Sequence, residues 1–154
     1  MADVSVLVLD IDGVLTNGEV ILDGDGRESK SLFFRDIDAV FAARQAGLRV
    51  VLVTGENTPI VDAIARKLDV VEVHRDRKDK LEALHVLGVP LQYVCFVGDS
   101  PRDAPALEAA GLGLAPADAA PEALAAADRV LESPGGRGAV GEAIALVLGT
   151  PASA

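Results

Sequence analysis

Two aspartates one residue apart are the first side chains in this sequence that could carry out chemistry. Asp10 and Asp12 follow an apolar run from Val4 to Leu9, and Gly13 comes directly after them. Such a run is typical of a central strand covered on both faces, and open α/β sheets bind ligands at the carboxyl ends of their strands. Neighbouring carboxylates repel, so the pattern predicts a hard divalent cation with oxygen ligands. The alternative is a solvated acidic turn, because Asp-x-Asp-Gly also suits turns.

Other polar residues stand at similar points along the chain. Thr54 follows a second apolar run, Asp99 and Asp103 follow a later one, and Lys80 lies near the start of a predicted helix. The carboxyl ends of parallel strands share one edge of a sheet, so these residues should converge on Asp10. Carboxylates would hold magnesium, and a hydroxyl with an ammonium would bind a phosphoryl group. One carboxylate could then attack phosphorus while a neighbour transfers the proton.

Each of these residues also has a purely structural interpretation. Thr54 and Asp99 could cap the helices that follow them, and Lys80 could be a solvated lysine on an amphipathic helix. Taken one at a time these interpretations are favoured. Four such residues at successive strand ends favour a shared phosphoryl-transfer site instead.

The elements that must position these residues alternate between strand and helix. This order predicts one domain over residues 1–154, a three-layer αβα sandwich around a central parallel sheet with right-handed crossovers. The predicted strands are 4–9, 48–53, 70–73, 93–97, 112–115 and 129–131, and the predicted helices are 36–47, 59–68, 78–87, 104–111, 121–127 and 139–148. Asp-Gly pairs between apolar runs predict an early β-hairpin over 19–34, and the last residues, 150–154, should be a disordered tail.

Composition narrows the class of partner. The formal net charge is −10, which argues against nucleic acid or an anionic membrane surface. No apolar run approaches the roughly 18 residues of a membrane span, and no basic-then-apolar leader is present. Cys95, the one cysteine, lies in an apolar run, which favours a buried structural thiol in a reducing cytoplasm over a nucleophile.

These motifs, in this order, resemble the four signature motifs of the haloacid dehalogenase superfamily of phosphohydrolases. The resemblance implies that Asp10 is the nucleophile and that Asp12 is the general acid and then the general base. It implies that Thr54 binds a phosphate oxygen and that Lys80 neutralises nucleophile and phosphate.

The same resemblance implies a Mg²⁺ site. Its ligands would be the carboxylate of Asp10, the backbone carbonyl of Asp12 and the carboxylate of Asp99. Asp103 would orient Lys80 or a metal-bound water. Ser100 stands where the family has a second Asp after Asp99 and would support the site from behind.

The stretch between Asp12 and Thr54 is too short for the cap domain of many superfamily members. The chain therefore resembles the small capless tetrameric phosphatases of phosphorylated 3-deoxy-2-keto sugar acids. One branch cleaves octulosonate 8-phosphate and another nonulosonate 9-phosphate. This resemblance implies a homotetramer in which the hairpin of one subunit covers the active site of its neighbour.

Residues outside the four motifs point to both branches. Glu56 and Lys67 resemble the nonulosonate branch, whereas Arg137 in a Gly-Gly-Arg-Gly loop resembles the octulosonate branch; with Thr54 and Gly55 they would bind substrate. Ile37 replaces a family glycine, which would narrow a position of close approach. Glu56 and Lys67 could also be plain exposed charges.

Two other functions fit parts of the pattern. A phospho-accepting receiver domain also combines an acidic pair, a Thr and a Lys on a parallel sheet, but its acceptor follows the third strand. A non-catalytic oligomerisation module, related to the phosphatase-like domain of cytidylyl-sialate synthetases, would keep the fold without the activity. The complete set of Asp10, Asp12, Lys80 and Asp99 argues for the enzyme.

Overall fold

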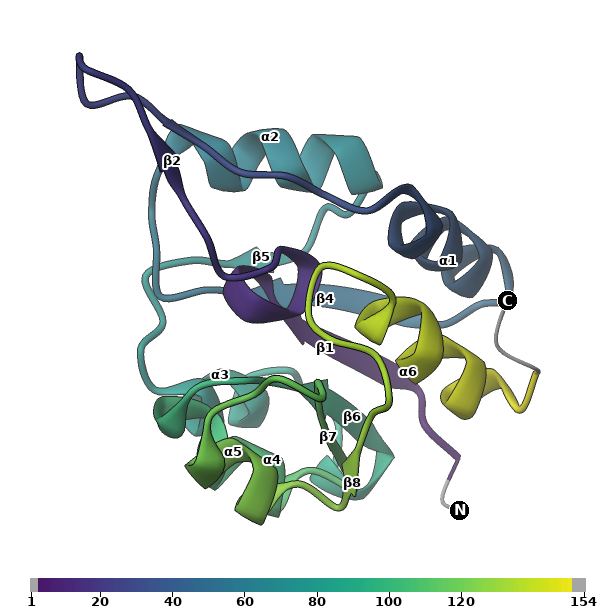
Figure 1. Cartoon of the computed structure of the whole chain (residues 1–154). Coiled ribbons are helices and arrows are strands. Elements are labelled where there is room, and N and C mark those ends of the chain that lie inside the picture. Colours follow the sequence, from purple (N-terminus) through teal and green to yellow (C-terminus); the bar gives the residue numbers. More distant parts are fainter. Residues whose placement is uncertain (1–2, 151–154) are drawn as a thin grey trace.

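A computed structural model describes residues 3–150, and a six-stranded parallel sheet forms its centre (Figure 1). The strand order is β5-β4-β1-β6-β7-β8. The strands are β1 Val6–Asp10, β4 Arg49–Val53, β5 Val73–His74, β6 Val94–Val97, β7 Leu112–Ala115 and β8 Arg129–Val130. Every residue of β1 is buried, which its continuous apolar run predicts. The strand that carries Asp10 therefore lies in the middle of the sheet.

Helices cover both faces of this sheet and complete the predicted three-layer αβα sandwich (Figure 1). Leu7 and Leu9 of β1 point into a core with α1 Phe34–Gln45, α2 Pro59–Leu68 and α6 Ala139–Leu148. Val6 and Val8 point into a second core with α3 Lys80–His85, α4 Ala104–Ala109 and α5 Pro121–Ala126. The alternation along β1 thus assigns the two faces. Between β1 and β4 the described chain holds only a short turn, a hairpin and α1, as expected for a capless member.

A tight turn that was not predicted follows β1. Ile11–Leu15 forms a single π-type turn, η1, interrupted by Asp12 in an extended conformation and by Gly13 with a φ of 83°. Thr16 closes the turn by donating its backbone N–H to the carbonyl of Ile11 at 3.1 Å. The chain therefore turns back over the end of β1 as soon as it leaves the sheet.

The early hairpin is present but shorter than predicted. Its strands are β2 Ile21–Leu22 and β3 Glu28–Ser29, and it projects away from the body of the molecule (Figure 1). The prediction that its second arm reaches Phe34 was wrong. Leu32 leaves the hairpin to pack against the core, and the carbonyl of Phe33 accepts the first backbone hydrogen bonds of α1, which begins at Phe34.

The third strand along the chain also differs from its prediction. It was expected over 70–73, but β5 covers Val73–His74. The residues before it finish α2 instead: Asp69 adopts a left-handed conformation, and the N–H of Val70 bonds to the carbonyl of Ala65. Val71 is then fully exposed. The edge strand β8 lies where it was predicted.

The end of the described chain is fixed to the body through α6. Asp36 in α1 accepts hydrogen bonds from the backbone N–H groups of Gly138 and Gly141 at 3.2 and 2.9 Å. Thr150, expected in the disordered tail, still donates to the carbonyl of Ala145. The rest of that tail lies outside the described residues. None of the described helices has the length and hydropathy that a bilayer crossing requires.

Candidate active site

Asp10, Lys80 and Asp103 meet at the carboxyl edge of the sheet. Asp10 ends β1, Lys80 begins α3, and Asp103 ends the 3-10 turn η3 Pro101–Asp103. The Lys80 Nζ lies 3.5 Å from Asp10 Oδ1 and 3.0 Å from Asp103 Oδ1, and all three side chains are buried. A buried ammonium needs counter-charges of this kind. The interpretation of Lys80 as a solvated surface lysine is therefore wrong.

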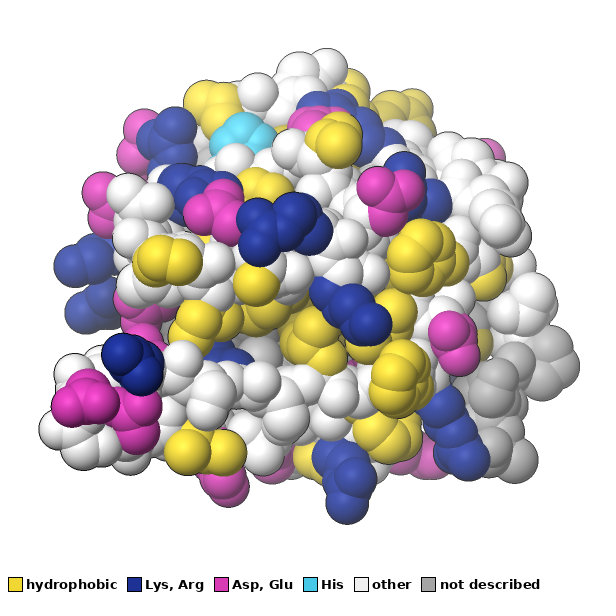
Figure 2. All heavy atoms as spheres, turned by 90° about the horizontal axis from the view of Figure 1, so that it is seen from above, with side chains coloured by type: hydrophobic (Ala, Val, Ile, Leu, Met, Phe, Trp, Pro, Cys, Tyr) yellow, Lys and Arg dark blue, Asp and Glu magenta, His cyan; other side chains and the backbone are white. Residues whose placement is uncertain are grey.

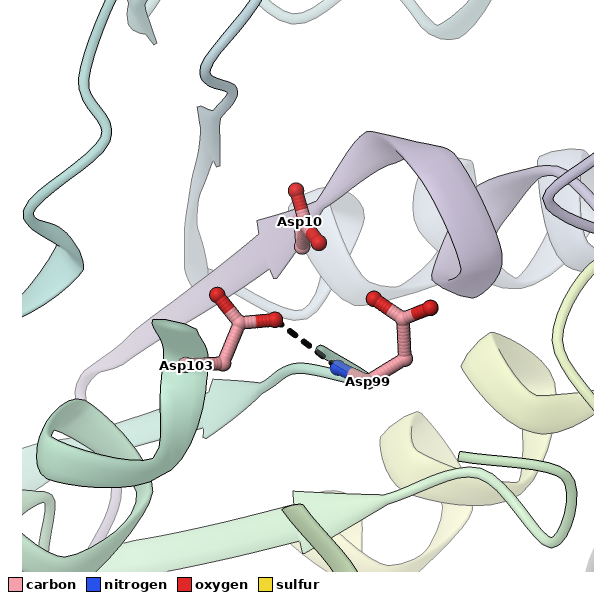
Figure 3. Close-up of side chains that lie close together, drawn as sticks. All are labelled: Asp10, Asp99 and Asp103. Carbon is pink, nitrogen blue, oxygen red and sulfur yellow. Dashed lines mark hydrogen bonds between the residues drawn. The ribbon is translucent and has the colours of Figure 1, made fainter. Parts of the chain in front are cut away.

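Asp103 uses both carboxylate oxygens to position its neighbours. Oδ1 contacts Lys80, while Oδ2 accepts the backbone N–H groups of Asp99 and Ser100 at 2.9 and 3.0 Å (Figure 3). Asp99 therefore does not cap a helix itself; the turn that carries it is held by Asp103. The carboxylates of Asp10 and Asp99 point toward one another across this arrangement (Figure 3). This geometry suits the expected positioning role of Asp103, and the role itself stays a prediction.

The electrostatics of this cluster fit a divalent cation. Ligand atoms of Asp10, Asp99 and Asp103 lie within 4.8 Å of one another. Burial, followed by repulsion from Asp103, holds the pKa of Asp10 well above its ordinary value, and burial raises the pKa of Asp99 to about 6. A hydrogen bond between Asp10 and Asp99 contributes in both cases. These carboxyls compete for a proton in a place that a hard cation would stabilise as two carboxylates.

Gly13 is the residue that allows the two acidic segments to approach. Its φ of 83° favours glycine, and a Cβ at this position would overlap the carboxylate of Asp99. The backbone N–H of Ile11 donates to Asp10 Oδ1 at 2.9 Å, which orients the carboxylate. The glycine of Asp-x-Asp-Gly thus has a steric reason.

Thr54 lies at the end of β4 and is almost fully buried. Its Oγ1 accepts the backbone N–H of Glu56 at 3.1 Å, whereas α2 begins only at Pro59. Thr54 is therefore not the helix cap that its structural interpretation required. It opens onto a cavity of about 670 Å³. The cavity is lined by Asp10, Asp12, Gly18, Thr54, Gly55, Glu56, Lys78, Lys80, Asp99, Ser100, Pro101 and Arg102.

Two residues expected to bind substrate lie elsewhere within the single chain. The Lys67 Nζ is 5.5 Å from the centre of the Phe34 ring, on a face where hydrophobic side chains lie between Lys and Arg side chains (Figure 2). The Arg137 Cζ is 5.8 Å from the centre of the Phe33 ring. Neither residue lines the cavity. Ile37 is buried in the core, so it does not narrow the cavity as expected.

The Gly-Gly-Arg-Gly loop contacts the site through its backbone. A Cβ at Gly135 would overlap the carbonyl oxygen of Gly13, and one at Gly136 would overlap the backbone of Asn17. The N–H of Gly136 donates to the carbonyl of Val14 at 2.9 Å. The two glycines therefore hold the turn that carries Asp12, a function that the sequence motif did not reveal.

Sequence reasoning also missed side chains at the edge of the cavity. Lys78 and Arg102 line it, and the Lys30 Nζ lies 2.7 Å from Asp12 Oδ1. Lys30 belongs to the end of the hairpin, far from Asp12 in sequence. The one available signal was its place among very few lysines in an acidic chain, and that signal does not identify a partner.

Comparison with known proteins agrees with this arrangement of fold and site. The family model of haloacid dehalogenase-like hydrolases matches residues 28–111. The chain is 34% identical over 150 residues to 3-deoxy-D-manno-octulosonate 8-phosphate phosphatase from Salmonella typhi, which covers 95% of this chain and 80% of the relative. The chain belongs to the haloacid dehalogenase-like hydrolases. The predicted superfamily and the predicted hydrolase class are thereby confirmed, and the receiver domain is not supported.

Solved structures narrow the resemblance. The octulosonate 8-phosphate phosphatase of Moraxella catarrhalis, determined with magnesium, phosphate and the sugar acid, matches with a TM-score of 0.91 and 29% identity over 96% of this chain and 87% of that one. A cobalt-bound form of the corresponding phosphatase from Haemophilus influenzae matches with a TM-score of 0.88 and 28% identity, covering 96% and 88%. The expected resemblance to capless sugar acid phosphatases is confirmed.

Proposed function

We propose that this protein is a Mg²⁺-dependent phosphomonoesterase that works through an aspartyl-phosphate on Asp10. The observation that carries the proposal is the cluster at the end of β1, where a buried lysine contacts Asp10 while Asp99 faces it. Phosphoryl transfer depends mainly on positioning and on neutralising negative charge. Lys80 and a cation between Asp10 and Asp99 supply both within one cavity.

In the first half-reaction, a carboxylate oxygen of Asp10 attacks phosphorus and the bond from phosphorus to the substrate oxygen breaks. The carboxyl of Asp12 gives its proton to that departing oxygen, which leaves as an alcohol. Lys80 and the hydroxyl of Thr54 bind the oxygens of the transferred group. The products of this step are the free sugar acid and a phosphorylated Asp10.

In the second half-reaction, water attacks the phosphorus of the acyl phosphate. The carboxylate of Asp12 accepts the proton of that water, the bond from phosphorus to Asp10 breaks, and inorganic phosphate leaves. Asp10 returns as a carboxylate and Asp12 as the acid, which closes the cycle.

The cation would be held by the carboxylates of Asp10 and Asp99 and by the backbone carbonyl of Asp12. When bound, it neutralises charge on the nucleophile and the transferring group. Asp103 is not needed as a ligand, because both its oxygens already accept hydrogen bonds. The cation-bound relatives support this assignment.

The proposed substrate is a phosphorylated 3-deoxy-2-keto sugar acid. Octulosonate 8-phosphate is the first candidate, because the curated relatives carry that activity in their names. Nonulosonate 9-phosphate is the second, since Glu56 lines the cavity in this chain. Gly55 and Ser100 also line the cavity and would contact the sugar or its phosphate.

We further propose that residues 1–154 work as one domain in a cytoplasmic homotetramer. Val20, Ile21 and Leu22 are half or more exposed in a single chain, which is unusual for three consecutive apolar residues. A neighbouring subunit that buried them would place its own cavity against the hairpin. In such an assembly Lys67 and Arg137 can reach the substrate of an adjacent subunit.

Phosphate release from both sugar acid phosphates, measured with and without Mg²⁺, tests the proposal. We expect turnover that a chelator abolishes, and none for Asp10→Asn, whose amide is isosteric but not nucleophilic. Incubation with ³²P-labelled substrate should label Asp10. Full activity in chelator would contradict the metal role, and normal turnover by Asp10→Asn would contradict the enzyme class.

The second candidate function is the non-catalytic oligomerisation module. The exposed apolar residues of the hairpin favour it, because they mark an interaction surface whether or not the site works. Complete lack of turnover of any phosphomonoester, together with a stable tetramer, would favour that function over the phosphatase.

A further inference from the structure

Lys30 is an unusual residue for the hairpin that carries it. The neighbouring Ser29 and Ser31 are exposed, and so is most of the hairpin, yet the side chain of Lys30 is only 10% exposed. A lysine gains little from burial unless a counter-charge receives its ammonium. The buried side chain therefore indicates a specific contact rather than a solvated surface charge.

That contact is with Asp12. The Lys30 Nζ donates to Asp12 Oδ1 at 2.7 Å, a short charge-assisted hydrogen bond. Asp12 sits in the irregular turn η1 with extended backbone angles, and its side chain is 36% exposed at the edge of the cavity. A carboxylate in such a place can adopt several rotamers, and the bond to Lys30 selects one of them.

The two lysines of the site have separate partners. Lys80 contacts Asp10 and Asp103, and among residues 3–150 Lys30 is the cation paired with Asp12. With Oδ1 of Asp12 held by Lys30, the second oxygen is left to exchange a proton with the substrate or with water. Proton transfer needs its two heavy atoms within hydrogen-bond reach, so this orientation affects rate.

We propose that Lys30 is a positioning residue that orients Asp12 for proton transfer and thereby makes the hairpin part of the catalytic machinery. The inference rests on the proposed phosphatase function and extends it to a residue outside the four motifs. Lys30 touches neither the nucleophile nor the proposed cation ligands at their carboxylates. Its effect should therefore pass through Asp12 alone.

The experiment is a double-mutant cycle measured as kcat and KM for phosphate release from octulosonate 8-phosphate. The variants are Lys30→Met, Asp12→Asn and the pair together, with Lys30→Arg to restore a cation and Arg27→Met as the matched control. Arg27→Met removes a positive charge from the same hairpin at an exposed position. Proton transfer is typically worth 10²–10⁴-fold, so losing its orientation should lower kcat of Lys30→Met about tenfold.

We expect KM of Lys30→Met to stay within about twofold, Lys30→Arg to recover part of kcat, and Arg27→Met to behave as wild type. In the Asp12→Asn background, Lys30→Met should cause no further loss, because residues that act as a unit are non-additive. A full additional loss there, or a rise in KM at unchanged kcat, would show a direct substrate contact and overturn the proposal.

The outcomes also separate this inference from the function on which it rests. A wild-type protein that releases phosphate while Lys30→Met keeps its kcat would overturn the role of Lys30 alone. A wild-type protein that hydrolyses neither sugar acid phosphate nor an aryl phosphate in Mg²⁺ would overturn the phosphatase and this inference together.

Discussion

Asp99 reaches the end of β1 because residue 13 has no side chain. The same residue adopts a φ that L-amino acids with a Cβ rarely take, so two independent constraints act on it. The position does not contribute a functional group to the reaction. It decides instead whether two carboxylates from distant parts of the chain can share one cation.

We predict that Gly13→Ala lowers phosphatase activity at least a hundredfold. The left-handed backbone costs alanine about 1–2 kcal/mol, and the overlap must displace Asp99, where a shift of about 1 Å can cost 10²-fold in rate. Gly24→Ala is the matched control, because no atom lies within 4 Å of the added Cβ. Phosphate release measures both variants, and wild-type activity of Gly13→Ala would contradict the steric argument.

The raised pKa of Asp99 predicts how Mg²⁺ binding depends on pH. Burial raises this pKa to about 6 in the cation-free protein, and the cation needs the carboxylate. Affinity measured by calorimetry should be constant well above pH 6 and fall about tenfold per unit below it, with a proton released on binding. An affinity that is equal at pH 7 and pH 5 would contradict this prediction.

The same shift fixes the sign of its effect on stability. The folded protein keeps the proton of Asp99 up to about pH 6, whereas the unfolded chain loses it near 3.8. The cation-free protein should therefore lose stability as the pH rises through this window. Mg²⁺ should restore that stability above pH 6, and melting temperatures in chelator and in Mg²⁺ measure both effects.

At the scale of elements, α1 and α6 are joined by a side chain that caps the wrong helix for its position. Asp36 belongs to the first turn of α1, yet its carboxylate accepts two backbone N–H groups at the start of α6. Burial raises the pKa of Asp36 despite these two bonds. A negative charge there also complements the positive end of the α6 dipole.

We predict that Asp36→Ala lowers the free energy of unfolding by about 2–3 kcal/mol, because it leaves two backbone donors without a charged partner. Asp38→Ala, an exposed position in the same helix, should stay within about 0.5 kcal/mol of wild type. Urea unfolding followed by circular dichroism gives both values. Equal stability of the two variants would show that water replaces the cap at no cost.

The elements also show which parts of the molecule a sequence can predict. Apolar runs such as that of β1 and the helical spacing of α2 identify buried faces directly, so the layers and the strand ends with Asp10, Thr54 and Asp99 could be predicted. The turn η1 could not, because its shape depends on the loop at Gly135 that packs against it from the other end of the chain. The contact between Lys30 and Asp12 is likewise invisible, since a hairpin arm carries no periodicity that encodes its tertiary partner.

At the scale of the whole molecule, the hairpin presents Ile21 and Leu22 to solvent, 66% and 64% exposed. It projects from the body and packs little of its own surface there (Figure 1). A two-stranded ribbon of this size is marginal alone, so a second subunit is the natural partner for its apolar face.

We predict a tetramer by multi-angle light scattering and smaller species for the double variant Ile21→Ser, Leu22→Ser. Sugar acid phosphate turnover by this variant should fall far more than turnover of a small aryl phosphate, which needs no cover. The substitutions leave Lys30 in place, so proton transfer is not removed with the interface. Asp25→Ser at the hairpin tip is the control, and a fully active wild-type monomer would refute the model.

The packing of Gly135 and Gly136 against the turn after β1 has a consequence for synthesis on the ribosome. The nucleophile is among the first residues to emerge, but the backbone that fixes its turn is translated almost last. A nascent chain would hold Asp10 in a strand whose neighbours β4 and β6 arrive in turn, while the turn with Asp12 waits for the final loop. The hydrolase would thus be switched on by completion of its own chain, and phosphorylated metabolites would be safe from every partly made copy.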